Sequence, residues 1–219
     1  MDSDYWKKAY QNTWEVSSGR ESEIAELIKK ETGLEVIASG LGSETSEFIS
    51  GSASQNGFEK GDPDLRIAGS NIYMEVTGPL SEKVRSSSPL WFRPDKIENA
   101  KNNLDSHDTF LLHNCPGEKL WRVIHVDKTF IESYDTGKYK TVRPRIRGNT
   151  EQYVEIPSDA ECIIPFSELI SYLKSINNKI CPKCGNILVR RTARTGFREG
   201  LDFWGCSTYP NCKYIMNID

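Results

Sequence analysis

The stretch Gly61–Gly78, GDPDLRIAGSNIYMEVTG, decides the fold of this 219-residue chain, because it has the pattern of a β-hairpin. Apolar and polar residues alternate through both of its halves, which predicts one buried and one polar face. Gly69-Ser70 suits a two-residue type II′ turn, since glycine tolerates the positive φ that this turn needs. The register that follows pairs Ala68 with Asn71, Arg66 with Tyr73 and Asp64 with Glu75.

The pairing of Asp64 with Glu75 is the functional clue in the hairpin. Two carboxylates that face each other on neighbouring strands repel, so the arrangement is favourable when a cation lies between them. Carboxylate oxygens and water are the ligands that Mg²⁺ or Mn²⁺ prefers. The alternative is an exposed turn, in which both acids are solvated. The pattern alone leaves both interpretations open.

The residues Pro63-Asp64, followed after ten residues by Glu75-Val76-Thr77, resemble the core of the PD-(D/E)XK nuclease superfamily. The resemblance implies a restriction endonuclease-like α/β (α+β) core, with a central mixed sheet flanked by helices. It also implies an Mg-dependent endodeoxyribonuclease, in which Asp64, Glu75 and the backbone carbonyl of Val76 bind Mg²⁺ or Mn²⁺. One departure is plain, because the Lys of the family motif falls at Thr77.

A helix from residue 19 or 20 to about Thr32 is expected, after a separate short helix within residues 2–18. Glu21 projects from its apolar stripe, where a lone carboxylate is costly to bury. In the superfamily a Glu on such a helix contributes to the metal site, and Glu21 matches it better than Glu23. The alternative is an acid in the first turn that the helix dipole favours.

Lys96 is expected near the start of a helix that Pro94 or Asp95 opens and that extends to Leu104. A lysine there is disfavoured by the helix dipole, which suggests another use. We assign it the charge that the motif lacks at Thr77, where it would stabilise the attacking hydroxide or the phosphoryl group. The alternatives are a plain surface lysine, or Lys83 or Arg93 in the same role.

The remaining chain alternates between strands and one further helix. Strands are expected at residues 34–39, 109–113, 120–127 and 153–156. A last helix, capped by Ser167, should extend to about Ile176. Cys115 and Cys162 are expected as packed thiols.

The C-terminal residues 177–219 contain two close cysteine pairs, Cys181/Cys184 and Cys206/Cys212, separated by a hairpin-length insert. Such spacing predicts a tetrahedral Zn²⁺ site, and about 40 residues have too little core to fold without such a staple. A disulfide framework is the alternative. The segment resembles the C-terminal four-Cys zinc ribbon of bacterial type IA topoisomerases, which implies binding of single-stranded DNA.

Charge divides the chain in the same place. Residues 1–176 hold 21 Lys and Arg against 28 Asp and Glu, a net charge of −7, whereas residues 177–219 hold 7 against 3, a net charge of +4. We therefore expect a nuclease-like domain over 1–176 and a DNA-binding ribbon over 177–219. No secretory or membrane-spanning segment is apparent, so the expected location is intracellular and cytoplasmic, nucleoid-associated in a prokaryote. The oligomeric state stays open, a homodimer included.

Basic and aromatic residues indicate where DNA would bind. Basic residues over 138–147 alternate along an extended segment and could follow a phosphate backbone, although a solvated hairpin arm has the same pattern. In the ribbon, aromatic rings offer stacking faces, with Tyr209 expected to be structural instead. The DNA-binding candidates are Lys138, Lys140, Arg143, Arg145, Arg147, Arg190, Arg191, Arg194 and Trp204.

The sequence therefore predicts a metal-dependent DNA endonuclease. Asp64, Glu75, Glu21 and Lys96 are its catalytic candidates, and the zinc ribbon holds single-stranded or branched DNA. The alternative is a non-catalytic DNA-binding protein on a nuclease-like scaffold, since Thr77 replaces the motif lysine.

Overall fold

A six-stranded mixed sheet forms the centre of the computed structural model, in the order β1-β2-β3-β5-β6-β11. The structure describes residues 3–43, 45, 49, 52–146, 149–177, 179 and 181–218, with the backbone alone for 3–13 and 177. Strands β3 and β5 are parallel, and the other neighbours are antiparallel. The strands are β1 (Val36–Ala38), β2 (Leu65–Ile67), β3 (Ile72–Thr77), β5 (Asp108–Cys115), β6 (Leu120–His125) and β11 (Ile163–Pro165).

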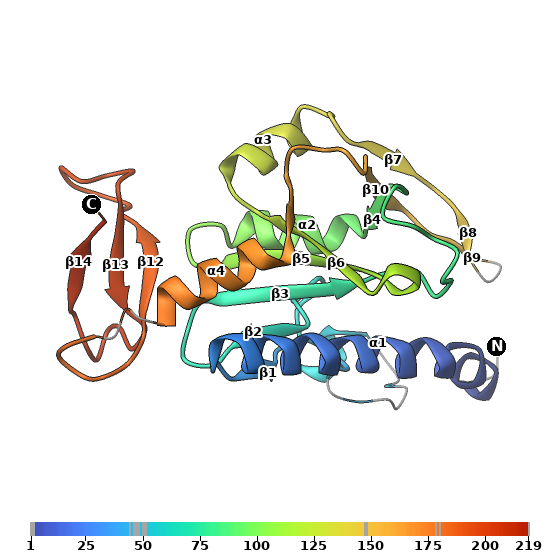
Figure 1. Ribbon diagram of the computed structural model, residues 1–219, viewed down its shortest axis with the longest axis horizontal. Helices are drawn as coiled ribbons and strands as arrows, with labels where there is room; N and C mark the ends of the chain where they lie inside the picture. Colours follow the sequence, from blue (N-terminus) through green and yellow to red (C-terminus); the bar gives the residue numbers. More distant parts are fainter. Residues whose placement is uncertain are drawn as a thin grey trace.

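Helices cover both faces of this sheet (Figure 1). On one face α1 (Ser3–Thr32) and α4 (Phe166–Asn177) share an apolar core with the sheet, which includes Ile24, Met74 and Leu173. On the other face α2 (Pro94–Asn102) and α3 (Lys128–Asp135) form a second core. The predicted α/β core, a mixed sheet flanked by helices, is confirmed. Within the described chain, no helix is long and apolar enough to cross a membrane.

Smaller elements complete the second layer. A three-stranded sheet in the order β4-β10-β7 packs beside α2 and α3, and a two-stranded arm, β8–β9, extends from it. These elements are β4 (Leu90–Phe92), β7 (Lys140–Val142), β8 (Arg145–Ile146), β9 (Asn149–Thr150) and β10 (Tyr153–Ile156), with short 3₁₀ turns at η1 (Ser54–Asn56) and η2 (Pro116–Glu118).

The central hairpin has the predicted register but a different turn. Leu65 pairs with Met74 and Arg66 with Tyr73. Ser70 N donates to Ile67 O at 3.1 Å, so Ala68-Gly69 forms the centre of the turn instead of Gly69-Ser70. The reason is the Ser70 hydroxyl, which donates to Ile67 O and accepts from Ile72 N, and so takes Ser70 out of the turn centre. Gly69 supplies the required positive φ of 70°.

Several local predictions were wrong or incomplete. Helix α1 is continuous over 30 residues, so no new helix begins at residue 19 or 20. Its buried stripe, which packs along β1, β3 and α4, favours continuation through the unfavourable Gly19. Strands β4 and β11 and helix α3 were not anticipated. Helix α4 already begins at Phe166, so Ser167 lies inside the helix and is not its cap. The sequence did contain one sign of α3, because Asp127 caps it by accepting from Phe130 N at 2.8 Å.

The C-terminal module is a three-stranded antiparallel sheet at one end of the molecule, directly after α4 (Figure 1). Its strands are β12 (Leu188–Thr192), β13 (Asp202–Cys206) and β14 (Ile215–Asn217). Leu188 and Trp204 belong to the same buried cluster as Leu173 and Ile176 of α4. The ribbon core is therefore continuous with the core of the body.

Candidate active site and zinc ribbon

The candidate active site begins with two carboxylates at the open end of the β2–β3 hairpin. Asp64 directly precedes β2, and the observed register brings it opposite Glu75. Asp64 Oδ2 accepts a hydrogen bond from Val76 N at 2.8 Å, which fixes this carboxylate against β3. Glu75 is 7% exposed and points away from the α1 face, on which Met74 and Val76 are packed.

Lys96 reaches both carboxylates from the first turn of α2. Its Nζ lies 2.6 Å from Glu75 Oε2 and 3.3 Å from Asp64 Oδ1. The same ammonium donates to the backbone oxygen of Asp62 at 2.8 Å. The structure thus brings together three residues that are up to 32 positions apart in the sequence.

The start of α2 explains why Lys96 lies there. Arg93 has an extended backbone, with φ −67° and ψ 136°, and Pro94 occupies the first helical turn, where its missing N–H costs nothing. Of the two rival cations, Lys83 is exposed. Arg93 instead forms an ion pair with Asp95, with Nη2 2.6 Å from Oδ2.

Close contact between the hairpin and α2 depends on a glycine. A Cβ at Gly61 would lie 2.3 Å from the backbone oxygen of Asp95, and the φ of Gly61 is 88°. Asn99 is buried on α2 and donates to Asp62 Oδ1 at 3.4 Å. Sequence reasoning missed Asn99 and the supporting role of Asp62, because both depend on the approach of two distant segments.

Burial and like charge dominate the electrostatics of the site. Burial, and then the neighbouring Asp64, raises the pKa of Glu75 well above its ordinary value, and Lys96 opposes the shift. Burial also lowers the pKa of Lys96, but the charges of Asp64 and Glu75 outweigh it and raise that pKa above its usual value. Two carboxylates thus face a single buried ammonium, and a further cation would bring the site closer to neutrality.

Replacing Lys96 by methionine should destabilise the fold by about 3–5 kcal/mol at neutral pH, because two buried carboxylates would lose their counter-charge. Lys96 lowers the pKa of Glu75, so its removal raises that pKa further. A carboxyl with a higher pKa in the folded than in the unfolded state makes the folded protein less stable as the pH rises. The stability lost on replacing Lys96 should therefore be smaller at about pH 5 than at about pH 8. Urea unfolding at both pH values measures it.

The matched control for this variant is Lys101→Met, on the same helix, where the lysine forms an exposed pair with Asp135. That substitution should leave stability close to that of the wild type, because an exposed ion pair is screened by solvent. An equal loss for Lys96→Met at both pH values would contradict the electrostatic explanation.

Glu21, the remaining catalytic candidate, is positioned by α1 and not by the hairpin or α2. It is buried, at 8% exposure, on α1, which covers the opposite face of the sheet from Lys96. Its neighbour Arg20 donates to the backbone oxygens of Gly78 and Pro79, just beyond β3. Among the described residues, no group of three acids that includes Glu21 has its oxygens within 4.8 Å of one another.

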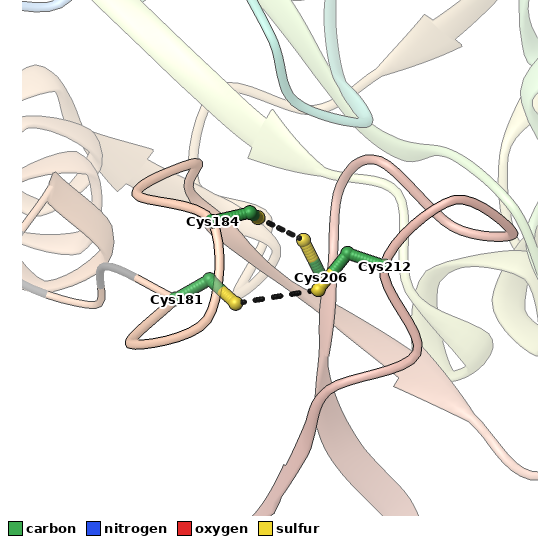
Figure 2. A group of neighbouring side chains, drawn as sticks. All are labelled: Cys181, Cys184, Cys206 and Cys212. Atoms are coloured by element: carbon green, nitrogen blue, oxygen red, sulfur yellow. Dashed lines mark hydrogen bonds between the residues drawn. The ribbon is translucent and has the colours of Figure 1, made fainter.

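The four predicted cysteine ligands converge in the ribbon (Figure 2). Their sulfur atoms all lie within 4.8 Å of one another, with Cys184 Sγ 3.3 Å from Cys206 Sγ and Cys181 Sγ 3.7 Å from Cys212 Sγ. All four are free thiols, so the disulfide alternative is excluded. Hydrogen bonds from Asn186, first from its backbone, lower the pKa of Cys184 to about 6. Against a backbone hydrogen bond from Tyr214, burial and the neighbouring thiols raise the pKa of Cys212 to about 11. Zinc binds the thiolate form of cysteine.

The exposure of two aromatic residues of the ribbon is opposite to that expected. Trp204 is 8% exposed and packs in the shared core, with Lys179 Nζ 5.2 Å from its ring centroid, so it offers no stacking face. Tyr209, expected to be structural, is 61% exposed, and the Arg191 guanidinium lies 5.9 Å from its ring centroid. Phe197, which sequence reasoning missed, is 94% exposed. The register decides this outcome, because Trp204 faces the body of the protein.

The predicted basic residues are only partly available to a ligand. Several already form ion pairs: Lys140 with Glu155 at 2.7 Å, Arg190 with Asp202 at 2.6 Å, and Arg194 with Asp105 at 3.7 Å. Lys138, Arg143 and Arg145 are exposed along the β7–β8 segment, and Arg147 lies outside the described residues.

Comparison with known proteins identifies the C-terminal module. Residues 178–219 match the family described as the topoisomerase DNA binding C4 zinc finger. A stretch of 42 residues, 19% of this chain, is 45% identical to the uncharacterized protein YrdD of Escherichia coli (strain K12). The match spans about a fifth (21%) of that relative's length. The module is therefore a four-Cys zinc ribbon of the topoisomerase type, as the sequence predicted.

One solved structure is similar to this chain over most of its length. The chain is similar to D212, a nuclease from a fusselovirus, with 19% sequence identity and a TM-score of 0.40. The alignment covers 72% of this chain and 91% of D212.

Proposed function

We propose that this chain is a metal-dependent nuclease that hydrolyses phosphodiester bonds in DNA. The observation that supports it is the buried arrangement of Asp64, Glu75 and Lys96, in which a lysine from a neighbouring helix lies against both carboxylates of a hairpin. This lysine supplies the positive charge that Thr77 cannot supply from the strand.

The donor set fits a hard divalent cation. Asp64 and Glu75 offer carboxylate oxygens, and Val76, which follows Glu75 in the chain, offers its backbone carbonyl. These three residues would hold Mg²⁺ or Mn²⁺. Burial, and then the negative charge of Asp64, raises the pKa of Glu75, and a bound cation would favour its ionised form. A metal bound there would polarise the phosphate and lower the pKa of a water nucleophile.

The protein residues would position and balance charge around the reacting phosphate. Lys96, held by the Asp62 carbonyl, places an ammonium where negative charge develops during phosphoryl transfer. The bond between Asp64 and Val76 N holds the carboxylate in one orientation. We also propose that Glu21 contributes to the metal site from α1, the helix that borders the end of β3.

The ribbon would hold the DNA strand. Exposed Tyr209 and Phe197 offer stacking faces, and Arg191 and Arg198 lie beside their rings. Lys138, Arg143 and Arg145 are proposed phosphate contacts on the body. A stacking surface favours unpaired bases, so single-stranded or branched DNA is the proposed substrate.

Alanine substitution at Tyr209 should weaken single-stranded DNA binding by about 1–3 kcal/mol while leaving stability unchanged. At Trp204 the same substitution should instead cost about 3–5 kcal/mol of stability, because the ring is buried in the shared core. Fluorescence anisotropy and thermal unfolding separate the two effects. Unchanged affinity in the folded Tyr209 variant would contradict the proposed stacking face.

One observation favours a second function, a non-catalytic DNA-binding protein. Lys96 already lies against both carboxylates and supplies part of their counter-charge without a metal. The test is cleavage of labelled single-stranded, duplex and branched DNA, with and without Mg²⁺ or Mn²⁺. Metal-dependent cutting supports the nuclease, whereas DNA binding without cutting under any of these conditions supports the second function.

A further inference from the structure

A cleft of about 330 Å³ lies between the body and the ribbon, separate from the carboxylate site. The body contributes Asn71, the segment from Leu104 to Asp108, and the first turn of α3. The ribbon contributes residues of β12 together with Gly200 and Asp202. Asn71 Nδ2 crosses the junction, donating to the backbone oxygen of Arg190 at 3.4 Å. The cleft is large enough for a small polar ligand.

The charges that line the cleft nearly balance, and its carboxylates are already engaged. Asp108 binds His125 and the Tyr172 hydroxyl, Asp127 caps α3, Asp202 binds Arg190 and Thr192, and Asp105 pairs with Arg194. Four aspartates thus face the three basic residues Lys128, Arg190 and Arg191. Such a lining does not select a phosphate group, but it suits a neutral group with hydrogen-bonding edges.

The aromatic ring of His107 lines the cleft. It stacks on Tyr73, which does not line the cleft itself, with ring centroids 4.0 Å apart and planes inclined by 28°. His107 Nδ1 is buried and has no hydrogen-bond partner among the described residues. Burial lowers the pKa of His107, which favours the neutral ring with one nitrogen able to accept a hydrogen bond. A flat ring with an unused polar atom is the surface on which nucleobases are held.

The ring pair also connects the cleft with the carboxylate site. Tyr73 lies two residues before Glu75 on β3, so both side chains point to the same side of the sheet. Asp62, whose carbonyl holds Lys96, is close enough to His107 to oppose the lowering of its pKa. A strand held by the ribbon would therefore pass the cleft on its way to the carboxylates.

We propose that this cleft receives one unpaired nucleobase of the DNA substrate, close to the bond that is cut. The substrate would then be DNA with an unpaired nucleotide beside the scissile phosphate, as at a single-stranded tail or a branch point. This inference rests on the proposed nuclease function, which it deepens.

An abasic scan tests the inference by binding alone. A duplex with a single-stranded tail is prepared with a base removed at each tail position in turn, and its affinity for the full-length, zinc-loaded chain is measured by anisotropy without Mg²⁺ or Mn²⁺. At one position near the junction, loss of the base should weaken binding about tenfold. In His107→Ala this penalty should fall to about twofold or less, whereas His107→Phe, which keeps a ring, should retain most of it.

Each outcome separates this inference from the proposed nuclease. A wild-type scan without any sensitive position overturns the inference, and so does a penalty that stays tenfold in folded His107→Ala. Because the wild-type scan needs no variant, poor folding of His107→Ala would not remove the test. If the scan finds a sensitive position but the protein never cuts DNA, the nuclease function is wrong and the cleft still binds a nucleobase. If the protein does not bind DNA at all, both proposals are wrong.

Discussion

Replacing Asp64 by asparagine should abolish DNA cleavage while DNA binding and folding persist. Asparagine keeps the shape and an oxygen that can accept from Val76 N, but it removes the negative charge that a divalent cation needs. Loss of groups that only support a metal ligand costs about 10–100-fold, so loss of this ligand should lower the cleavage rate by at least about a hundredfold. Single-turnover cleavage of labelled branched DNA in Mg²⁺ measures it.

The matched control is Asp135→Asn, which removes an exposed aspartate paired with Lys101 on the surface. It should cut DNA at the wild-type rate. If Asp64→Asn cuts as fast as this control, the carboxylate pair is not the catalytic centre. If neither variant nor the wild type cuts but all bind DNA, the non-catalytic function is correct.

Removing zinc should unfold the ribbon and also destabilise the body. Structural zinc sites contribute about 10–16 kcal/mol of apparent binding free energy, which is far more than a sheet of this size can supply by itself. The ribbon covers Leu173 and Ile176 of α4 with Leu188 and Trp204, so its unfolding exposes both α4 side chains. Partial exposure of two such side chains costs about 3 kcal/mol, and we expect the melting temperature to fall by about 6–12 °C.

Cys181→Ser is the variant for this experiment, and Cys162→Ser is its matched control. Cys162 lies outside the four-Cys group, beside the Tyr139 hydroxyl. Zinc content, the melting temperature measured by calorimetry, and the affinity for single-stranded DNA should all fall in Cys181→Ser. All three should stay near the wild-type values in the control. A melting temperature of the body that does not respond to zinc loss would contradict the continuous core.

The two sites depend on different kinds of stabilisation. The carboxylate site concentrates like charge in a buried place, which costs stability and is typical of functional sites. The ribbon contributes a rigid module fixed to α4 by a shared apolar core. If both predictions hold, the zinc site acts at a distance from the reaction, by keeping the DNA-holding surface in a constant position relative to the carboxylates.

Local patterns in the sequence were enough to determine the hairpin and the zinc ligands. Alternation with period two specified the buried face of β2 and β3. The register expected from a Gly69-Ser70 turn is the one observed, although the turn itself is centred on Ala68-Gly69. The spacing of two cysteine pairs identified four ligands whose sulfur atoms the structure brings together. Both are short-range properties that a single segment carries by itself.

Only the tertiary structure decided which distant residues meet. The contact of Lys96 with Asp64 depends on where α2 starts and on the close approach that Gly61 permits. Burial of Trp204 and exposure of Tyr209 depend on which side of the ribbon packs against α4. The cleft exists because two segments separated by more than 80 residues, Asn71 to His107 and Arg190 to Asp202, lie against each other. Periodicity cannot reveal such pairings, because packing between elements, and not the local pattern, selects them.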